Sequence, residues 1–122
     1  MKINTYKELT VWQKSMILVT IIYDITEKFP KDEIYGLRSQ MQRAAISIPS
    51  QIAEGYLRRH RKEYIHFLSI SLGSAAELET QILACKSLPK FKSVDFKNSE
   101  TLLDEIMKML YVMIKKMEEK AN

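Results

Sequence analysis

Apolar residues recur at three- and four-residue intervals along four stretches of the chain, and this period predicts four long α-helices. The predicted helices cover residues 10–28, 34–58, 62–88 and 99–119. Their connections are short except for residues 89–98, a loop that we expect its aromatic residues to hold in place. Four helices joined in this way predict an all-α fold, an antiparallel up-down-up-down four-helix bundle that forms a single domain over residues 1–122.

Capping residues and a proline decide how these helices begin and whether one of them is interrupted. Thr10 and either Asn98 or Ser99 are placed to cap the first and the last helix with a side-chain oxygen. Pro49 lies inside the second helix, where it removes one backbone hydrogen bond. The apolar spacing keeps its phase across Pro49, so we favour a kinked continuous helix over two separate helices.

The first and last helices carry more apolar residues than one buried face requires. Scattered exposed apolar residues are normal, but here they form coherent second stripes, and a large apolar patch usually marks an interface. We therefore predict a homo-oligomer that assembles through these two helices. The candidate interface residues are Trp12, Met16, Val19, Tyr23, Met109 and Met113.

Composition supports a globular helical protein. Apolar residues make up 46% of the chain and charged residues 28%, and three glycines and three prolines are too few for a turn-rich β fold. The single cysteine, Cys85, allows no intramolecular disulfide, which favours a reducing, cytoplasmic setting. The most apolar stretch, residues 16–25, is too short to cross a bilayer, so we expect no membrane association.

The formal net charge of +4 is compatible with a nucleic-acid partner, and the cations are clustered. The densest cluster follows the second helix and consists of Arg58, Arg59, His60, Arg61 and Lys62. A second basic patch is predicted at the opposite end of the bundle, formed by Lys86, Lys90, Lys92 and Lys97. Both are candidates for phosphate contacts, although a solvated turn explains the first cluster equally well.

Polar residues within the second and third helices are the sharpest local signal for chemistry. Antiparallel packing about a turn near residue 60 places Arg43 opposite Glu77 and Ser47 opposite Gly73. One interpretation makes Glu54 and Glu77 an acid–base pair. We favour a structural Arg43–Glu77 ion pair, because no nucleophile or base with a clear partner accompanies these carboxylates.

No cofactor or metal motif is complete. Glu63-x-x-His66 matches half of a di-iron bundle motif, which needs a second copy and two further glutamates. His60 and His66 are six residues apart, a spacing that does not place them on one helix face. Neither a phosphate-binding glycine loop nor a nucleophile elbow is present in the sequence. We therefore predict a non-enzymatic protein without cofactor or metal.

Several segments together resemble a known family. They are Leu9-Thr-Val-Trp-Gln-Lys, Phe29-Pro-Lys-Asp-Glu-Ile-Tyr-Gly-Leu-Arg, Gln40-Met-Gln-Arg-Ala-Ala-Ile-Ser-Ile-Pro-Ser-Gln-Ile-Ala-Glu-Gly, Glu63-Tyr-Ile-His-Phe-Leu and Gly73-Ser-Ala-Ala-Glu-Leu-Glu-Thr. Over about residues 6–88 the chain resembles the four-helix-bundle family of proteins encoded in intervening sequences of 23S ribosomal RNA genes. The accessory variability proteins of diversity-generating retroelements are similar.

The resemblance implies a ring-shaped homopentamer and, in the retroelement branch, a basic surface that binds nucleic acid and a reverse transcriptase partner. We expect an oligomeric bundle that binds RNA or DNA through its basic patches. The alternative is a protein–protein adaptor or scaffold without direct nucleic-acid binding.

Overall fold

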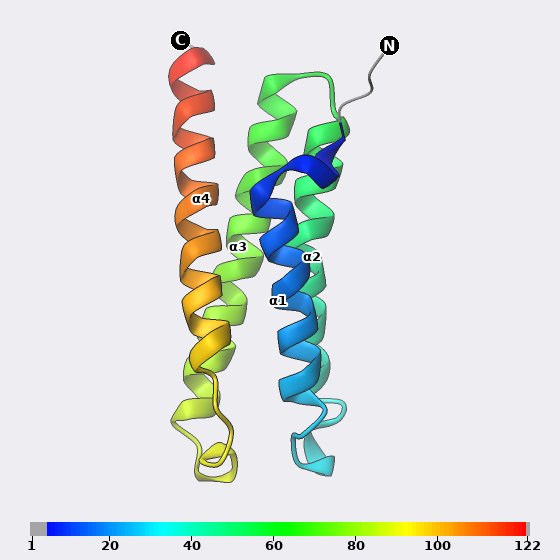
Figure 1. The fold of residues 1–122 in the computed structure, drawn as a ribbon, viewed down its shortest axis with the longest axis vertical. Coiled ribbons are helices and arrows are strands. Elements are labelled where there is room, and N and C mark those ends of the chain that lie inside the picture. Colours follow the sequence, from blue (N-terminus) through cyan, green and yellow to red (C-terminus); the bar gives the residue numbers. More distant parts are fainter. Residues whose placement is uncertain (1–4, 122) are drawn as a thin grey trace.

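The computed structural model describes residues 5–121, and four antiparallel helices account for most of them (Figure 1). The helices are α1 (Thr10–Thr26), α2 (Leu37–Leu57), α3 (Arg61–Lys86) and α4 (Lys97–Ala121), with short 3-10 helices at η1 (Tyr6–Glu8), η2 (Lys31–Glu33) and η3 (Pro89–Phe91). Residues 5–121 contain no β-strand. The predicted all-α, up-down-up-down bundle is confirmed.

One apolar stripe from each helix forms the core. Its largest fully buried aliphatic side chains are Leu18 and Ile22 of α1, Met41, Ile48 and Ile52 of α2, Leu68, Leu78 and Ile82 of α3, and Leu103, Ile106 and Leu110 of α4. Burying each such side chain contributes about 1.5–3 kcal/mol. Within the described part of the chain, no helix combines the length and hydropathy that a membrane crossing requires.

The structure tests two predictions about helix ends and continuity: that Thr10 caps α1, and that α2 continues through Pro49. Leu9, with an extended backbone, is the N-cap of α1, and its side chain makes no capping hydrogen bond. Thr10 is the first helical residue, so its predicted capping role is wrong. Pro49 lies within an uninterrupted α2, which excludes the alternative of two separate helices. Pro49 is buried in the bundle, so packing offsets the hydrogen bond that it removes.

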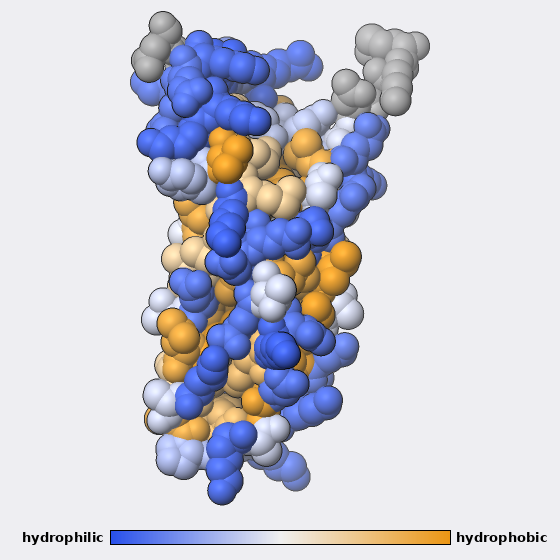
Figure 2. Space-filling model, turned by 60° about the vertical axis from the view of Figure 1, so that its left-hand side comes forward, coloured by the Kyte–Doolittle hydropathy of each residue, from blue (hydrophilic) through white to orange (hydrophobic). Residues whose placement is uncertain are grey.

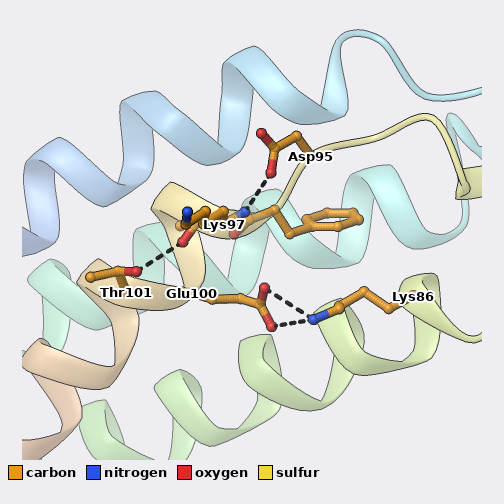
Figure 3. Close-up of polar contacts among 7 residues, drawn as sticks. Lys86, Asp95, Lys97, Glu100 and Thr101 are labelled. Atoms are coloured by element: carbon orange, nitrogen blue, oxygen red, sulfur yellow. Dashed lines mark hydrogen bonds and ion pairs between the residues drawn. The ribbon is translucent and has the colours of Figure 1, made fainter.

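The start of α4 also differs from the prediction. The helix begins two residues early, at Lys97, and the Lys97 N–H donates to Asp95 Oδ1 at 2.9 Å (Figure 3). Ser99 is buried inside the first turn, where its hydroxyl donates to the Phe96 carbonyl. Asn98 and Ser99 therefore do not cap α4. Phe96, whose ring is buried, directly precedes the helix and accepts from the Glu100 N–H, so the Asp95 carboxylate reaches the first turn from one residue further back.

Aromatic packing fixes the loop between α3 and α4, as the sequence predicts. Phe91 and Phe96 are buried, and their ring centroids lie 4.7 Å and 6.3 Å from that of Phe29 after α1. Val94 also packs against the core. These contacts join the two connections at one end of the bundle, which we call the aromatic tip.

Small residues bring α2 and α3 close together. The hydroxyls of Ser47 and Ser74 lie 2.8 Å apart, one residue from the predicted register, and Ser71 donates to the Ile48 carbonyl at 2.9 Å. Near the turn, Gly55 is buried against α3. A side chain at this position would force α2 and α3 to shift, since an added Cβ would lie 2.8 Å from Phe67 Cβ and 3.3 Å from the Tyr64 carbonyl oxygen.

Gly55→Ala is expected to lower the free energy of unfolding by about 1–3 kcal/mol. The added Cβ would lie 2.8 Å from Phe67 Cβ and 3.0 Å from Tyr64 Cδ1. Gly73→Ala is the matched control: apart from its own stretch of helix, no described atom lies within 4 Å of its Cβ position, so the helix propensity of alanine should raise stability by up to about 1 kcal/mol. Urea unfolding measures both, and a stabilised Gly55→Ala would contradict the close approach.

Candidate functional site

The predicted basic cluster forms the exposed turn between α2 and α3. Arg58 is the C-cap of α2, and its guanidinium lies 3.4 Å from Glu54 and 3.7 Å from Glu63. The same guanidinium lies 5.0 Å from the centroid of the Phe67 ring. These contacts hold Arg58 against the protein, so it is a poorer candidate for a phosphate contact than its neighbours.

The remaining cations of the turn are free to contact a ligand. Arg59, Arg61 and Lys62 are exposed, and the ion pairs within residues 5–121 include none of them. Arginine presents a fork of donors that suits phosphate oxygens, and lysine adds a point charge. The turn therefore presents three unpaired cations to solvent.

The last turns of α4 lie at the same end of the bundle (Figure 1). They carry exposed Lys115, Lys116 and Lys120, with Glu118 and Glu119 among them. Hydrophilic residues gather around this end (Figure 2). We call the surface formed by Arg59, Arg61, Lys62, Lys115, Lys116 and Lys120 the basic end. The predicted up-down-up-down topology already implies that α4 finishes beside this turn, so its lysines could have been assigned to the site from the sequence.

The second predicted patch, at the aromatic tip, is partly neutralised. Lys86 Nζ contacts both carboxylate oxygens of Glu100, at 2.9 Å and 3.2 Å (Figure 3). Lys90 Nζ lies 3.0 Å from Asp32 and 2.9 Å from Glu33. Lys92 and Lys97 are exposed, and no ion pair within residues 5–121 includes either of them. Paired lysines attract phosphate less, so this patch is the weaker candidate.

The hydrogen bond from Lys90 perturbs both partners. It is the largest cause that lowers the pKa of Glu33, and the backbone N–H of Leu37 acts in the same direction. Conversely, the Glu33 hydrogen bond, followed by that of Asp32, raises the pKa of Lys90. The ion pairs of Lys90 with Asp32 and Glu33 connect η3 to η2. Because these charges neutralise one another, Lys90 offers less charge to a ligand.

Arg43 and Glu77 face the same groove but do not form the predicted ion pair. The groove, of about 360 Å³, lies between α2 and α3. No ion pair joins Arg43 to Glu77 in the described chain. Both side chains are exposed, and the Ser47–Ser74 hydrogen bond supplies the direct polar contact between the helices at this level.

The alternative acid–base pair is not brought together. Glu54 pairs with Arg58 at the turn, whereas Glu77 lies beside Ala44, ten residues back along α2. Ten helical residues span about 15 Å. Desolvation by burial raises the pKa of the Cys85 thiol to about 11, so this thiol stays protonated at neutral pH and is a poor nucleophile. Within the described residues, no group of three or more histidine, cysteine or acidic side chains is placed to hold a metal ion.

An apolar groove of about 430 Å³ runs between α1 and α2. Trp12, Met16 and Val19 of α1 form one wall, as their second stripe suggests. Sequence reasoning missed the other wall, which consists of Ile46, Pro49, Ser50 and Ala53 of α2. Met16 and Ile46 are each 42% exposed, so the groove is open to a partner.

Of the candidate interface residues only Met16 is exposed, and Trp12 and Val19 are half-buried. Tyr23 is half-buried, and Met109 and Met113 are half-buried against the core. The exposed apolar residues of α4 are instead Tyr111 and Val112. Tyr111 and Val112 lie on the side of α4 that faces solvent, whereas Met109 and Met113 lie on the sides that pack against the other helices.

Comparison with known proteins finds one family model that matches most of the chain. The family model described as 23S rRNA-intervening sequence protein matches residues 7–112, which include α1, α2, α3 and most of α4. No curated protein matches the chain.

Lys90→Gln is expected to lower the urea midpoint modestly near neutral pH, because it removes the ties to Asp32 and Glu33. Glu33 has a lowered pKa in the folded state, so its contribution is present above the ordinary glutamate pKa and is lost as pH falls through the folded value. The difference between wild type and Lys90→Gln should therefore shrink below about pH 4. A difference that stays constant from neutral pH to about pH 3 would contradict the tie.

Proposed function

The chain belongs to the 23S rRNA-intervening sequence protein family, and on that premise we propose that it is a non-enzymatic, self-associating bundle that binds RNA or DNA through its basic end. The observation that carries the proposal is the contrast between the two ends of the bundle. At the aromatic tip, Lys86 and Lys90 are held by carboxylates, whereas at the turn Arg59, Arg61 and Lys62 remain exposed and unpaired among the described residues.

The basic end suits contact with a phosphate backbone. Cations without carboxylate partners release counterions from nucleic acid when they bind, and this term is independent of base sequence. The turn lies at the same end of the bundle as the last turns of α4 (Figure 1), and the charges that it offers suit phosphate oxygens, which carry no information on base sequence. We therefore propose backbone binding with a strong dependence on salt concentration.

Self-association would place several copies of the basic end in one assembly, so that sites of low individual affinity could bind one nucleic acid together. The resemblance to ring-forming proteins leads us to propose a homopentamer, which would carry five copies of the basic end. Sites held in one assembly act together, because binding at one raises the effective concentration at the next. The open groove lined by Trp12, Met16 and Ile46 supports assembly, since burying it would remove apolar surface from water.

Two observations support a non-enzymatic role. The two carboxylates proposed for acid–base chemistry, Glu54 and Glu77, lie at different levels of the bundle. The only thiol is buried and has a raised pKa.

The second candidate function is an adaptor, favoured by the same apolar groove. In this case the α1–α2 groove receives an amphipathic segment of another protein, such as a reverse transcriptase, and the charges at the basic end are incidental. Binding of a purified partner that survives nuclease treatment and high salt would distinguish this function from nucleic-acid binding.

Replacing Arg59, Arg61 and Lys62 by alanine should weaken binding of a single-stranded RNA in a filter assay. The slope of log affinity against log salt should flatten by roughly 2, since each phosphate contact contributes about 0.7 to it. The matched control replaces Lys28, Lys92 and Lys97, three exposed lysines toward the other end, and should change neither value appreciably. Equal weakening in both triple variants would contradict a local binding surface, and no binding by wild type at low salt would contradict the function.

Ile46→Glu should convert the assembly to a monomer, because it places a charge in the α1–α2 groove. Light scattering measures the molar mass in solution. Tyr35→Glu, at a position that is 94% exposed and outside the groove, is the control and should leave the mass unchanged. A monomeric wild type at micromolar concentration would refute self-association, and an oligomeric Ile46→Glu would exclude this groove as the interface.

A further inference from the structure

Two helices hold the side chain of Arg58 by one carboxylate each. Glu54 of α2 lies 3.4 Å from one terminal nitrogen of the guanidinium, and Glu63 of α3 lies 3.7 Å from the other. Only Arg59 and His60 separate Arg58 from the first residue of α3. Arg58 therefore lies beside the exposed cations of the turn, with both ends of its guanidinium facing carboxylates. We call Arg58, Glu54 and Glu63 the Arg58 clamp.

The Arg58 clamp is loose enough for another anion to compete with its carboxylates. Both distances exceed the length of a charge-assisted hydrogen bond, about 2.7–2.9 Å. Within residues 5–121 the Arg58 side chain donates no hydrogen bond, whereas Arg38 donates to Glu27 at 2.8 Å. The three side chains of the clamp are 44%, 51% and 46% exposed, so a ligand from solvent can reach them.

The ring of Phe67 supports the guanidinium of Arg58 without using its donors. The Arg58 Cζ atom lies over this ring, 5.0 Å from the centroid. Arginine contacts an aromatic ring through its flat face, whereas its N–H donors point outward in the plane of the group. The backbone is anchored as well, since the Arg58 N–H donates to the Gly55 carbonyl at 3.1 Å. The side chain is therefore held in place with its donors directed at the two carboxylates.

The carboxylates of the clamp also lower the positive charge of the turn. Residues 58–62 include three arginines and one lysine, and Glu54 and Glu63 formally offset two of these four charges. A phosphate that approaches the exposed cations meets the carboxylates as like charges, which oppose binding. The two glutamates therefore weaken the surface twice, by repulsion and by occupying a guanidinium.

We propose that Arg58 is a fourth phosphate contact of the turn, held in reserve by Glu54 and Glu63, and that these carboxylates set how tightly a nucleic-acid strand binds. The proposal rests on the proposed function, in which the three unpaired cations of the turn contact the strand. An exposed ion pair is weak, whereas arginine can bind two oxygens of one phosphate side by side. A phosphate at the turn competes for the guanidinium, and the carboxylates restrain the exchange.

The test is filter binding of a single-stranded RNA by the full chain over a series of salt concentrations. Glu54→Gln/Glu63→Gln removes both carboxylates and keeps the size of the side chains. This double variant should bind about four- to twentyfold more tightly, since each exposed charge pair changes an equilibrium by about two- to fivefold. The slope of log affinity against log salt should steepen by about 0.7, because Arg58 becomes one more contact to the strand.

Adding Arg58→Gln to the double variant separates the released guanidinium from the loss of negative charge. If Arg58 is the additional contact, the salt slope of this triple variant should return to that of wild type. A clamp that only stabilises the turn would give no steeper slope in the double variant, and Arg58→Gln would have nothing to reverse.

Glu27→Gln/Glu100→Gln is the matched control. It also removes two paired carboxylates, but these belong to the ion pairs with Arg38 and Lys86, toward the aromatic tip. Its affinity and salt slope should stay close to those of wild type. Circular dichroism and urea unfolding establish that all variants are folded.

The outcomes separate the reserve contact from the function on which it rests. A double variant that binds no more tightly than wild type, a salt slope that does not steepen, or an equal gain in the control overturns the reserve contact and leaves nucleic-acid binding intact. Binding by the double variant but not by wild type supports the reserve contact and contradicts the proposed function. No binding by either protein overturns both.

Discussion

The close packing of α2 against α3 is the constraint on which the rest of the structure depends. The two helices approach at Gly55, where an added Cβ would meet Phe67, and at the Ser47–Ser74 hydrogen bond. This approach fixes the register of the central hairpin and forces the chain to reverse over the few residues after Leu57. Cations in so short a turn project into solvent. The basic end is thus a consequence of helix packing as much as of charge.

At the aromatic tip, in contrast to the basic end, lysines are paired with carboxylates. Phe29, Phe91 and Phe96 draw two connections together, and this brings Lys90 to the acidic side chains of η2. Paired lysines there stabilise the fold, and their pairing leaves less charge for a ligand. Basic residues are dense in the sequence at both ends, but tertiary contacts decide which cations remain available.

The sequence was sufficient for the helices, the topology and the turn cluster, because these follow from local period and composition. It did not predict the contacts between the two connections at the aromatic tip, such as Lys90 with Asp32, which are 58 residues apart. It also could not give the rotation of α2, which turns Ile46 into the α1–α2 groove.

The most direct test is a footprint of the nucleic-acid contact. Arginine and lysine modification, read by mass spectrometry, would compare the free protein with protein saturated by a single-stranded oligonucleotide. We predict protection of Arg59, Arg61 and Lys62, with Lys86 and Lys90 modified equally in both samples. Protection confined to the lysines of the aromatic tip, or no protection at saturation, would contradict it.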